Sequence, residues 1–174
     1  MTSRFRWPIE ACAILPVAPD AVWAVLSTPE HLTRFHPFVK YNPTDNWPGK
    51  NARDFVYYAS GIVLERIVTR WDKSGIDLLV GKPGGQQSRA IWRLRPHGVD
   101  ETELTIAIEL NTLQWLPWPL RALPFYVAIM PSAQSYLEFV IKGLDFYLRT
   151  GQRVTSDQFG RHPLFSGKKN NRRA

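Results

Sequence analysis

No standard catalytic signature occurs in this chain. The sequence has no GxSxG nucleophile elbow, no P-loop and no HExxH motif, and its four histidines are not at metal-ligand spacing with acids or with Cys12. We therefore expect no cofactor and no metal. Any catalysis would be acid–base work by isolated polar groups. The candidate acids and bases are Glu65, Arg53 and Tyr57, and the further candidates for the same site are Tyr58, Arg66, Trp92 and Tyr126.

The role of Glu65 depends on which face of its strand points inward. One face of the expected strand 62–71 carries Ile62, Leu64, Arg66, Val68 and Arg70, and the other carries Val63, Glu65, Ile67, Thr69 and Trp71. The second face is the more apolar, which would bury Glu65, raise its pKa and allow it to act as an acid or base. The alternative places Glu65 outside, beside an arginine. His36 is interpreted as a structural loop histidine.

Alternating residues predict the strands that would position these groups. Turn-forming residues separate expected strands at 5–15, 38–41, 53–59, 62–71, 76–80, 88–94 and 101–110, with two short helices after the first strand. Successive hairpins without a βαβ rhythm indicate an antiparallel meander. In the last two strands, the inner face is expected to carry Ala90, Trp92, Leu94, Leu104, Ile106 and Ile108, while arginines and glutamates pair on the outer face.

A long amphipathic helix is expected from Ser132 to Leu148, with Ser132 as its cap and Gly151 at its end. The apolar segment 113–130 before it contains three prolines and cannot form one helix. It is interpreted as a loop packed over the sheet, a lid over a cavity, or a membrane-interface segment that uses Trp115 and Trp118.

Composition and charge exclude some classes of partner. The net charge is +7, but residues 152–174 hold six basic residues and one acid, so the remainder carries only +2. Nucleic-acid binding is not expected, because such charge should lie on the folded face. No secretory signal and no apolar run of about eighteen residues occur, which predicts a cytoplasmic protein. We expect a domain at 1–151 and a basic tail at 152–174. That tail could be disordered, attract anionic lipid, or dock through Phe159, Pro163, Leu164 and Phe165.

The opening residues 17–32 read VAPDAVWAVLSTPEHL and resemble the start of the START-like, or Bet v 1-like, superfamily of polyketide cyclase/dehydrase-type (SRPBCC) proteins. Trp47-Pro48-Gly49, Glu65-Arg66-Ile67-Val68 and Trp71-Asp72 resemble its later marks. The resemblance covers about residues 8–150 and implies an α+β helix-grip fold. In that fold, six or seven antiparallel strands wrap a long C-terminal helix and leave an apolar cavity.

The resemblance implies that the cavity holds a small apolar ligand. The residues expected to line it are Tyr57, Leu64, Trp92, Leu94, Ile106, Ile108, Leu116, Phe125, Tyr126, Leu137, Val140, Ile141 and Leu144. Three functions stay open. They are a non-enzymatic binding or carrier protein, a cyclase/dehydratase-like enzyme that uses Glu65, Arg53 or Tyr57, and a membrane-peripheral lipid or quinone carrier that uses Trp115, Trp118 and the basic tail.

Overall fold

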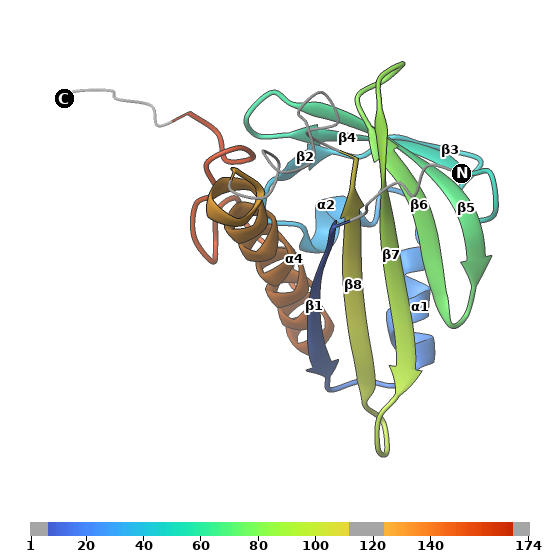
Figure 1. Cartoon of the computed structure of the whole chain (residues 1–174). Helices are drawn as coiled ribbons and strands as arrows, with labels where there is room; N and C mark the ends of the chain where they lie inside the picture. Colours follow the sequence, from blue (N-terminus) through green and yellow to red (C-terminus); the bar gives the residue numbers. More distant parts are fainter. Residues whose placement is uncertain (1–6, 112–123, 169–174) are drawn as a thin grey trace.

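The computed structural model describes residues 7–111 and 124–168. Within these ranges, eight strands form one antiparallel sheet in the spatial order β1-β8-β7-β6-β5-β4-β2, with β3 also paired to β4 (Figure 1). The strands are β1 (Trp7–Leu15), β2 (Val39–Tyr41), β3 (Thr44–Asp45), β4 (Arg53–Tyr58), β5 (Val63–Asp72), β6 (Gly75–Gly81), β7 (Gln87–Pro96) and β8 (Thr102–Leu110). The two-residue β3 is the strand that the sequence did not predict.

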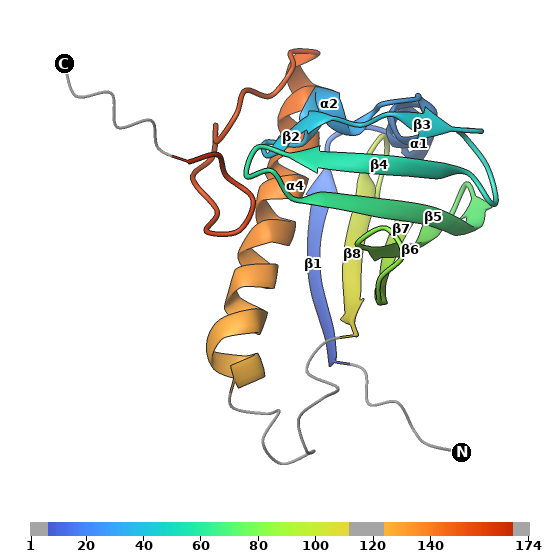
Figure 2. The same ribbon diagram turned by 90° about the horizontal axis from the view of Figure 1, so that it is seen from above.

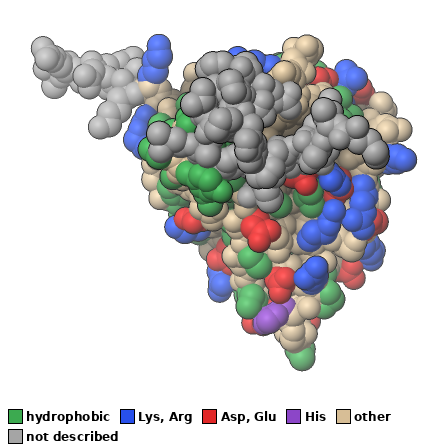
Figure 3. Space-filling model, viewed as in Figure 1, with side chains coloured by type: hydrophobic (Ala, Val, Ile, Leu, Met, Phe, Trp, Pro, Cys, Tyr) green, Lys and Arg blue, Asp and Glu red, His purple; other side chains and the backbone are tan. Residues whose placement is uncertain are grey.

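The inner and outer faces of β7 and β8 are as predicted. Trp92 pairs with Ile106 and Leu94 with Leu104, and all four side chains are buried. On the outer face, Arg89 lies 3.8 Å from Glu109, and Arg95 lies at the same distance from Glu103. Figure 3 shows basic and acidic side chains interspersed on this side of the molecule.

In the first half of β5, the inward face is the less apolar of the two that the sequence offered, the face with Leu64, Arg66 and Val68. Arg66 and Val68 are buried toward the inside. A bulge then follows, because Val68 pairs with Leu78 whereas Arg70 pairs with Asp77, leaving Thr69 as the extra residue. The bulge reverses the alternation, so Trp71 also turns inward, with its ring centroid 4.7 Å from that of Trp23. A strict two-residue period over the whole strand could not decide between its two faces, because the inner face changes at this bulge.

Helices cover the concave side of the sheet. They are α1 (Pro19–Ser27), α2 (Leu32–Phe35), the π-helical turn η1 (Phe125–Ile129) and α4 (Met130–Thr150). Figure 2 shows α4 running beside β1, with α2 at one end. The last helix starts before Ser132, which therefore does not cap it. The left-handed Gly151, at φ 67°, ends the helix as predicted.

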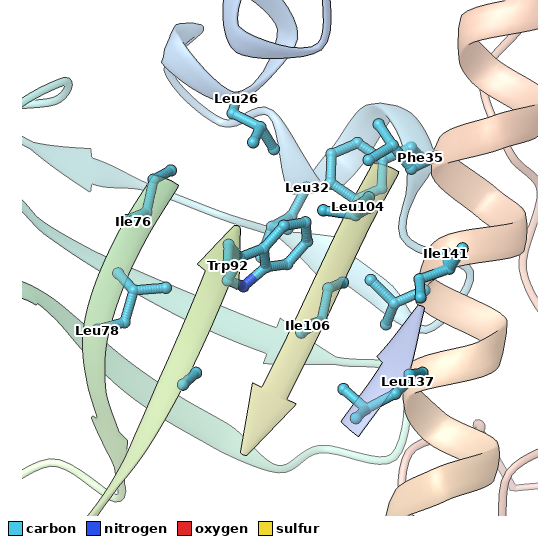
Figure 4. Close-up of a cluster of buried hydrophobic side chains, with 14 of the residues drawn as sticks. Leu26, Leu32, Phe35, Ile76, Leu78, Trp92, Leu104, Ile106, Leu137 and Ile141 are labelled. Atoms are coloured by element: carbon cyan, nitrogen blue, oxygen red, sulfur yellow. The ribbon is translucent and has the colours of Figure 1, made fainter. Parts of the chain in front are cut away.

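The core lies where α2, α4 and the sheet meet. Figure 4 shows Leu32 and Phe35 of α2 beside Trp92 of β7, with Leu137 and Ile141 reaching in from α4. The approach of α4 to α2 is close enough to require glycine. A Cβ atom on Gly143 would lie only 2.0 Å from the carbonyl oxygen of Phe35.

Residues 152–168 return to the domain after α4 (Figure 2). The Val154 N–H donates to the Arg34 carbonyl at 2.9 Å, and the Ser60 N–H donates to the Phe165 carbonyl at 3.2 Å. Phe165 lies against Tyr58, with their ring centroids 4.4 Å apart. This part of the expected tail therefore contributes hydrogen bonds and aromatic contacts to the domain.

Part of the apolar segment 113–130 lies outside the described residues, including Trp115, Leu116 and Trp118. Within the described part of the chain, no helix has both the length and the hydropathy needed to cross a bilayer.

Candidate functional site

A cavity of about 680 Å³ lies between the inner face of the sheet and α4. Its described wall is mostly apolar and comes from four strands and one helix: Leu64, Leu78, Val80, Ala90, Trp92, Ile106, Ile108, Ala133, Leu137 and Val140. The exposed lining residues Gln86, Ala128 and Leu164 mark its rim. The size falls within the range of about 300–1,000 Å³ that is usual for small-molecule pockets.

The structure places six of the expected ligand-binding residues on this wall: Leu64, Trp92, Ile106, Ile108, Leu137 and Val140. Leu94, Phe125, Ile141 and Leu144 are buried but lie outside the described lining. Tyr57 and Tyr126 have 39% and 58% of their surface exposed and also lie outside it. Leu116 falls outside the described residues.

The three acid–base candidates do not line the cavity. Glu65 lies on the outer face of β5, and its Oε1 is 3.3 Å from Nε of Arg53. Tyr57 also points outward, where its ring lies 6.4 Å from that of Tyr41. Of the two orientations that the sequence left open for Glu65, the structure has the outward one beside an arginine, because Leu64, Arg66 and Val68 occupy the inner positions before the bulge.

An ion pair is buried at one part of the wall. Asp54 and Arg66 are paired across β4 and β5, and Nε of Arg66 donates to Oδ1 of Asp54 at 2.7 Å while Nη2 donates to Oδ2. Burial alone would raise the pKa of Asp54 and lower that of Arg66. Their mutual attraction outweighs burial, so the pKa of Asp54 is lowered and that of Arg66 is raised.

His31 lies against this ion pair in its neutral form. Its Nδ1 donates to the Thr28 carbonyl at 3.2 Å, which leaves Nε2 to accept from Nη2 of Arg66 at 3.4 Å. Burial, and next the charge of Arg66, lower the pKa of His31 to about 3. Trp47 covers the group, with its ring stacked 4.9 Å from His31 and 5.8 Å from the Arg66 guanidinium.

A second polar group joins α4 to β4 through hydrogen bonds. Nδ1 of His36 accepts the Phe38 N–H at 3.2 Å, so its Nε2 carries the proton and donates to the Tyr136 hydroxyl at 2.9 Å. The Tyr136 hydroxyl is 2.8 Å from that of Tyr58. Burial, and next the charge of Arg66, lower the pKa of His36 to about 3. Burial raises the pKa of both tyrosines, so both keep their protons at neutral pH.

The C-terminal segment completes this side of the wall with residues 162–165. Nδ1 of His162 accepts the Leu164 N–H, and its Nε2 donates to the Ser132 carbonyl at 2.9 Å. Ser132 thus takes part in holding the segment. Phe165 lies over Tyr136, with their ring centroids 4.7 Å apart.

Sequence reasoning missed Asp54, His31 and Tyr136 as polar groups of the site. His36 lies outside helix and strand, as expected of a loop histidine, but its contact with Tyr136 was not predicted. One signal was available: Asp54 shares a parity with Val56 and Tyr58, which predicts that all three face inward. The partners of the histidines lie far away in the chain, and no spacing rule reveals them. Within the described ranges, no three His, Cys, Asp or Glu side chains are placed to hold a metal ion.

The chain resembles known proteins in its three-dimensional structure and not in its sequence. No protein-family model and no curated protein matches the sequence. Among solved structures, a START superfamily protein from Mycobacterium smegmatis superposes with a TM-score of 0.63 at 14% identity, covering 85% of this chain and 100% of that one. Ara h 8.0201 gives 0.64 at 13% identity, covering 84% and 99%.

DynU16, a protein in the dynemicin biosynthetic locus, superposes with a TM-score of 0.65 at 15% identity over 84% of this chain. The match spans 48% of the length of DynU16. At such low identity, these superpositions relate the chain to its neighbours by fold alone. The chain therefore has an α+β helix-grip fold, in which an antiparallel sheet packs against a long C-terminal helix.

Proposed function

We propose that this protein binds one small hydrophobic molecule in the cavity between its sheet and α4. The cavity itself is the observation that carries this proposal, since about 680 Å³ is enclosed mainly by aliphatic side chains and Trp92. Apolar surface removed from water stabilises a complex by about 25 cal/mol per Å² before the costs of association are counted. The folds of the neighbours, among them a START superfamily protein and Ara h 8, agree with such a role.

The residues that line the cavity favour binding without catalysis over an acid–base enzyme. The acid–base candidates Glu65, Arg53 and Tyr57 lie outside the cavity. The inner histidines, His31 and His36, have both ring nitrogens engaged by protein groups. We infer a carrier or sequestering role. Peripheral membrane contact through Trp115, Trp118 and the basic tail stays a prediction.

The proposal is tested by titration with N-phenyl-1-naphthylamine, an uncharged dye that fluoresces in apolar surroundings. We expect saturable binding of one dye per chain. Ala90→Phe adds a ring to the inner wall and should weaken binding at least tenfold. Ala107→Phe makes the same change on the outer face of β8, where Ala107 pairs with Ile91, and should leave binding unchanged.

Absence of saturable binding to the wild-type protein would overturn the proposal. Equal binding by the two variants would also overturn it, because the dye would then lie elsewhere on the protein.

A further inference from the structure

The tyrosine pair at the cavity wall has one more hydrogen-bond donor than it uses. His36 Nε2–H and the two hydroxyls of Tyr58 and Tyr136 are three donors, and they form two hydrogen bonds among themselves. Whichever hydroxyl donates to the other, one O–H proton is left over. No further hydrogen bond joins either hydroxyl to a described residue, and both tyrosines line the cavity.

The histidine nitrogens and the carboxylate near this unused proton are already occupied as acceptors. Nδ1 of His36 takes the Phe38 N–H, Nε2 of His31 faces Arg66, and both oxygens of Asp54 are held by Arg66. Arg66 also lines the cavity, and its Nη1 has no acceptor among the described residues. These buried polar groups therefore offer donors to a ligand, and the acceptors that they leave are the phenolic oxygens of the two tyrosines.

The charges near the tyrosine pair are balanced. The bidentate contact with Asp54 neutralises Arg66, and the hydrogen-bond pattern fixes His31 and His36 as uncharged rings. An anionic ligand would find no unpaired cation among these groups, and burying an uncompensated charge is costly. A buried donor left without an acceptor is also unfavourable.

We propose that the cavity takes an uncharged apolar molecule that carries a carbonyl oxygen, and that this oxygen accepts the free O–H of the Tyr58–Tyr136 pair. This inference rests on the proposed function, since it names the chemical class of ligand for the same cavity. A carbonyl supplies an acceptor and brings no donor, which matches the wall. An alcohol brings an O–H of its own, which would exchange its hydrogen bond to water for one to a phenolic oxygen, a weaker acceptor than water.

Four compounds with the same three-ring skeleton test the inference on the wild-type protein: fluorenone, fluorene, 9-fluorenol and fluorene-9-carboxylate. By calorimetry or competition with the dye, fluorenone should bind about tenfold more tightly than fluorene, a difference of about 1.4 kcal/mol. Fluorenol and the carboxylate should bind more weakly than fluorenone. The carbonyl stretching band of bound fluorenone should lie at a lower frequency than in hexane.

Variants locate the donor. Tyr58→Phe alone leaves the hydroxyl proton of Tyr136 free. We therefore expect this single variant to keep part of the preference for fluorenone over fluorene. The double variant Tyr58→Phe/Tyr136→Phe should bind fluorenone and fluorene equally, and the carbonyl band should return to its hexane position. The matched control is Tyr41→Phe/Tyr57→Phe, which removes two hydroxyls outside the cavity and should change nothing.

The outcomes separate this inference from the proposed function. If fluorene binds and fluorenone binds no better, the cavity binds apolar molecules but the carbonyl inference is wrong. If the carboxylate binds most tightly, the ligand is an anion, and the inference of an uncharged ligand is wrong. If the wild-type protein binds none of the four compounds and no dye, the proposed function fails and the inference fails with it. Should the double variant not fold, the wild-type comparison and the infrared band still decide.

Discussion

Mild acid should destabilise this protein through two buried histidines. His31 and His36 have their pKa lowered from 6.5 to about 3, by burial first and by the charge of Arg66 next. Because the folded-state pKa lies below the unfolded value, the unfolded chain binds more protons between pH 6.5 and 3. The contribution of these two histidines to the free energy of unfolding is therefore fully present above pH 6.5 and is lost as the pH falls toward 3.

The size of the effect follows from the shift. One pKa unit corresponds to about 1.36 kcal/mol, so each histidine should remove about 2 kcal/mol of unfolding free energy between pH 7 and pH 5, and the pair about 4. Small domains have about 5–15 kcal/mol in total, so the loss is measurable. Asp54 does not interfere in this window. Its lowered pKa contributes stability that is present above 3.8 and is lost only at more acid pH.

Urea unfolding at pH 7, 6 and 5 measures the loss. His31→Gln and His36→Gln should each reduce the pH dependence by about half. His97→Gln should leave it unchanged, because His97 is exposed in the turn between β7 and β8. An unfolding free energy that is constant from pH 7 to 5 would contradict the lowered pKa values of His31 and His36, as would imidazole nitrogen NMR shifts that show either buried ring charged at pH 5.

Three substitutions give further predictions. Asp54→Asn leaves Arg66 buried without its partner and should lower the unfolding free energy by about 3–5 kcal/mol in urea; a loss below 1 kcal/mol would contradict the burial of this pair. Gly143→Ala gains about 1 kcal/mol of helix propensity. It meets the Phe35 carbonyl, however, and should show a net loss of about 1–2 kcal/mol, whereas a gain in thermal stability would mean that α4 and α2 are farther apart. Phe165→Ala removes a ring from the cavity wall and should lower stability by about 1–3 kcal/mol and speed dye release in stopped-flow mixing; an unchanged release rate would contradict the contact.

Much of the fold could be predicted because its signals are local. The alternation in β7 and β8 identified Trp92 and Ile106 as inner residues, and three-and-four spacing identified Leu137 and Val140 on α4. Local signals failed where the structure departs from regular periods. The bulge after Val68 reverses the inner face of β5, and a period of two cannot express such a reversal.

The polar part of the site was harder to predict because its contacts join distant residues. His36 meets Tyr136 a hundred residues later, and Tyr58 meets it from β4. In the sequence, His36 reads as a loop residue beside Pro37, and Tyr136 reads as one apolar position of a helix. Only the folded arrangement turns them into a hydrogen-bonded group with a spare donor.

Methyl NMR during a titration with fluorene tests whether the cavity binds an apolar molecule. We expect the methyl signals of Leu64, Ile106 and Val140 to shift and saturate at one equivalent, while those of the exposed Ile14 and Val99 stay in place. If the signals of the lining methyls do not move, or if the shifts lie on the outer face of the sheet, the cavity does not bind fluorene and the proposed function is contradicted.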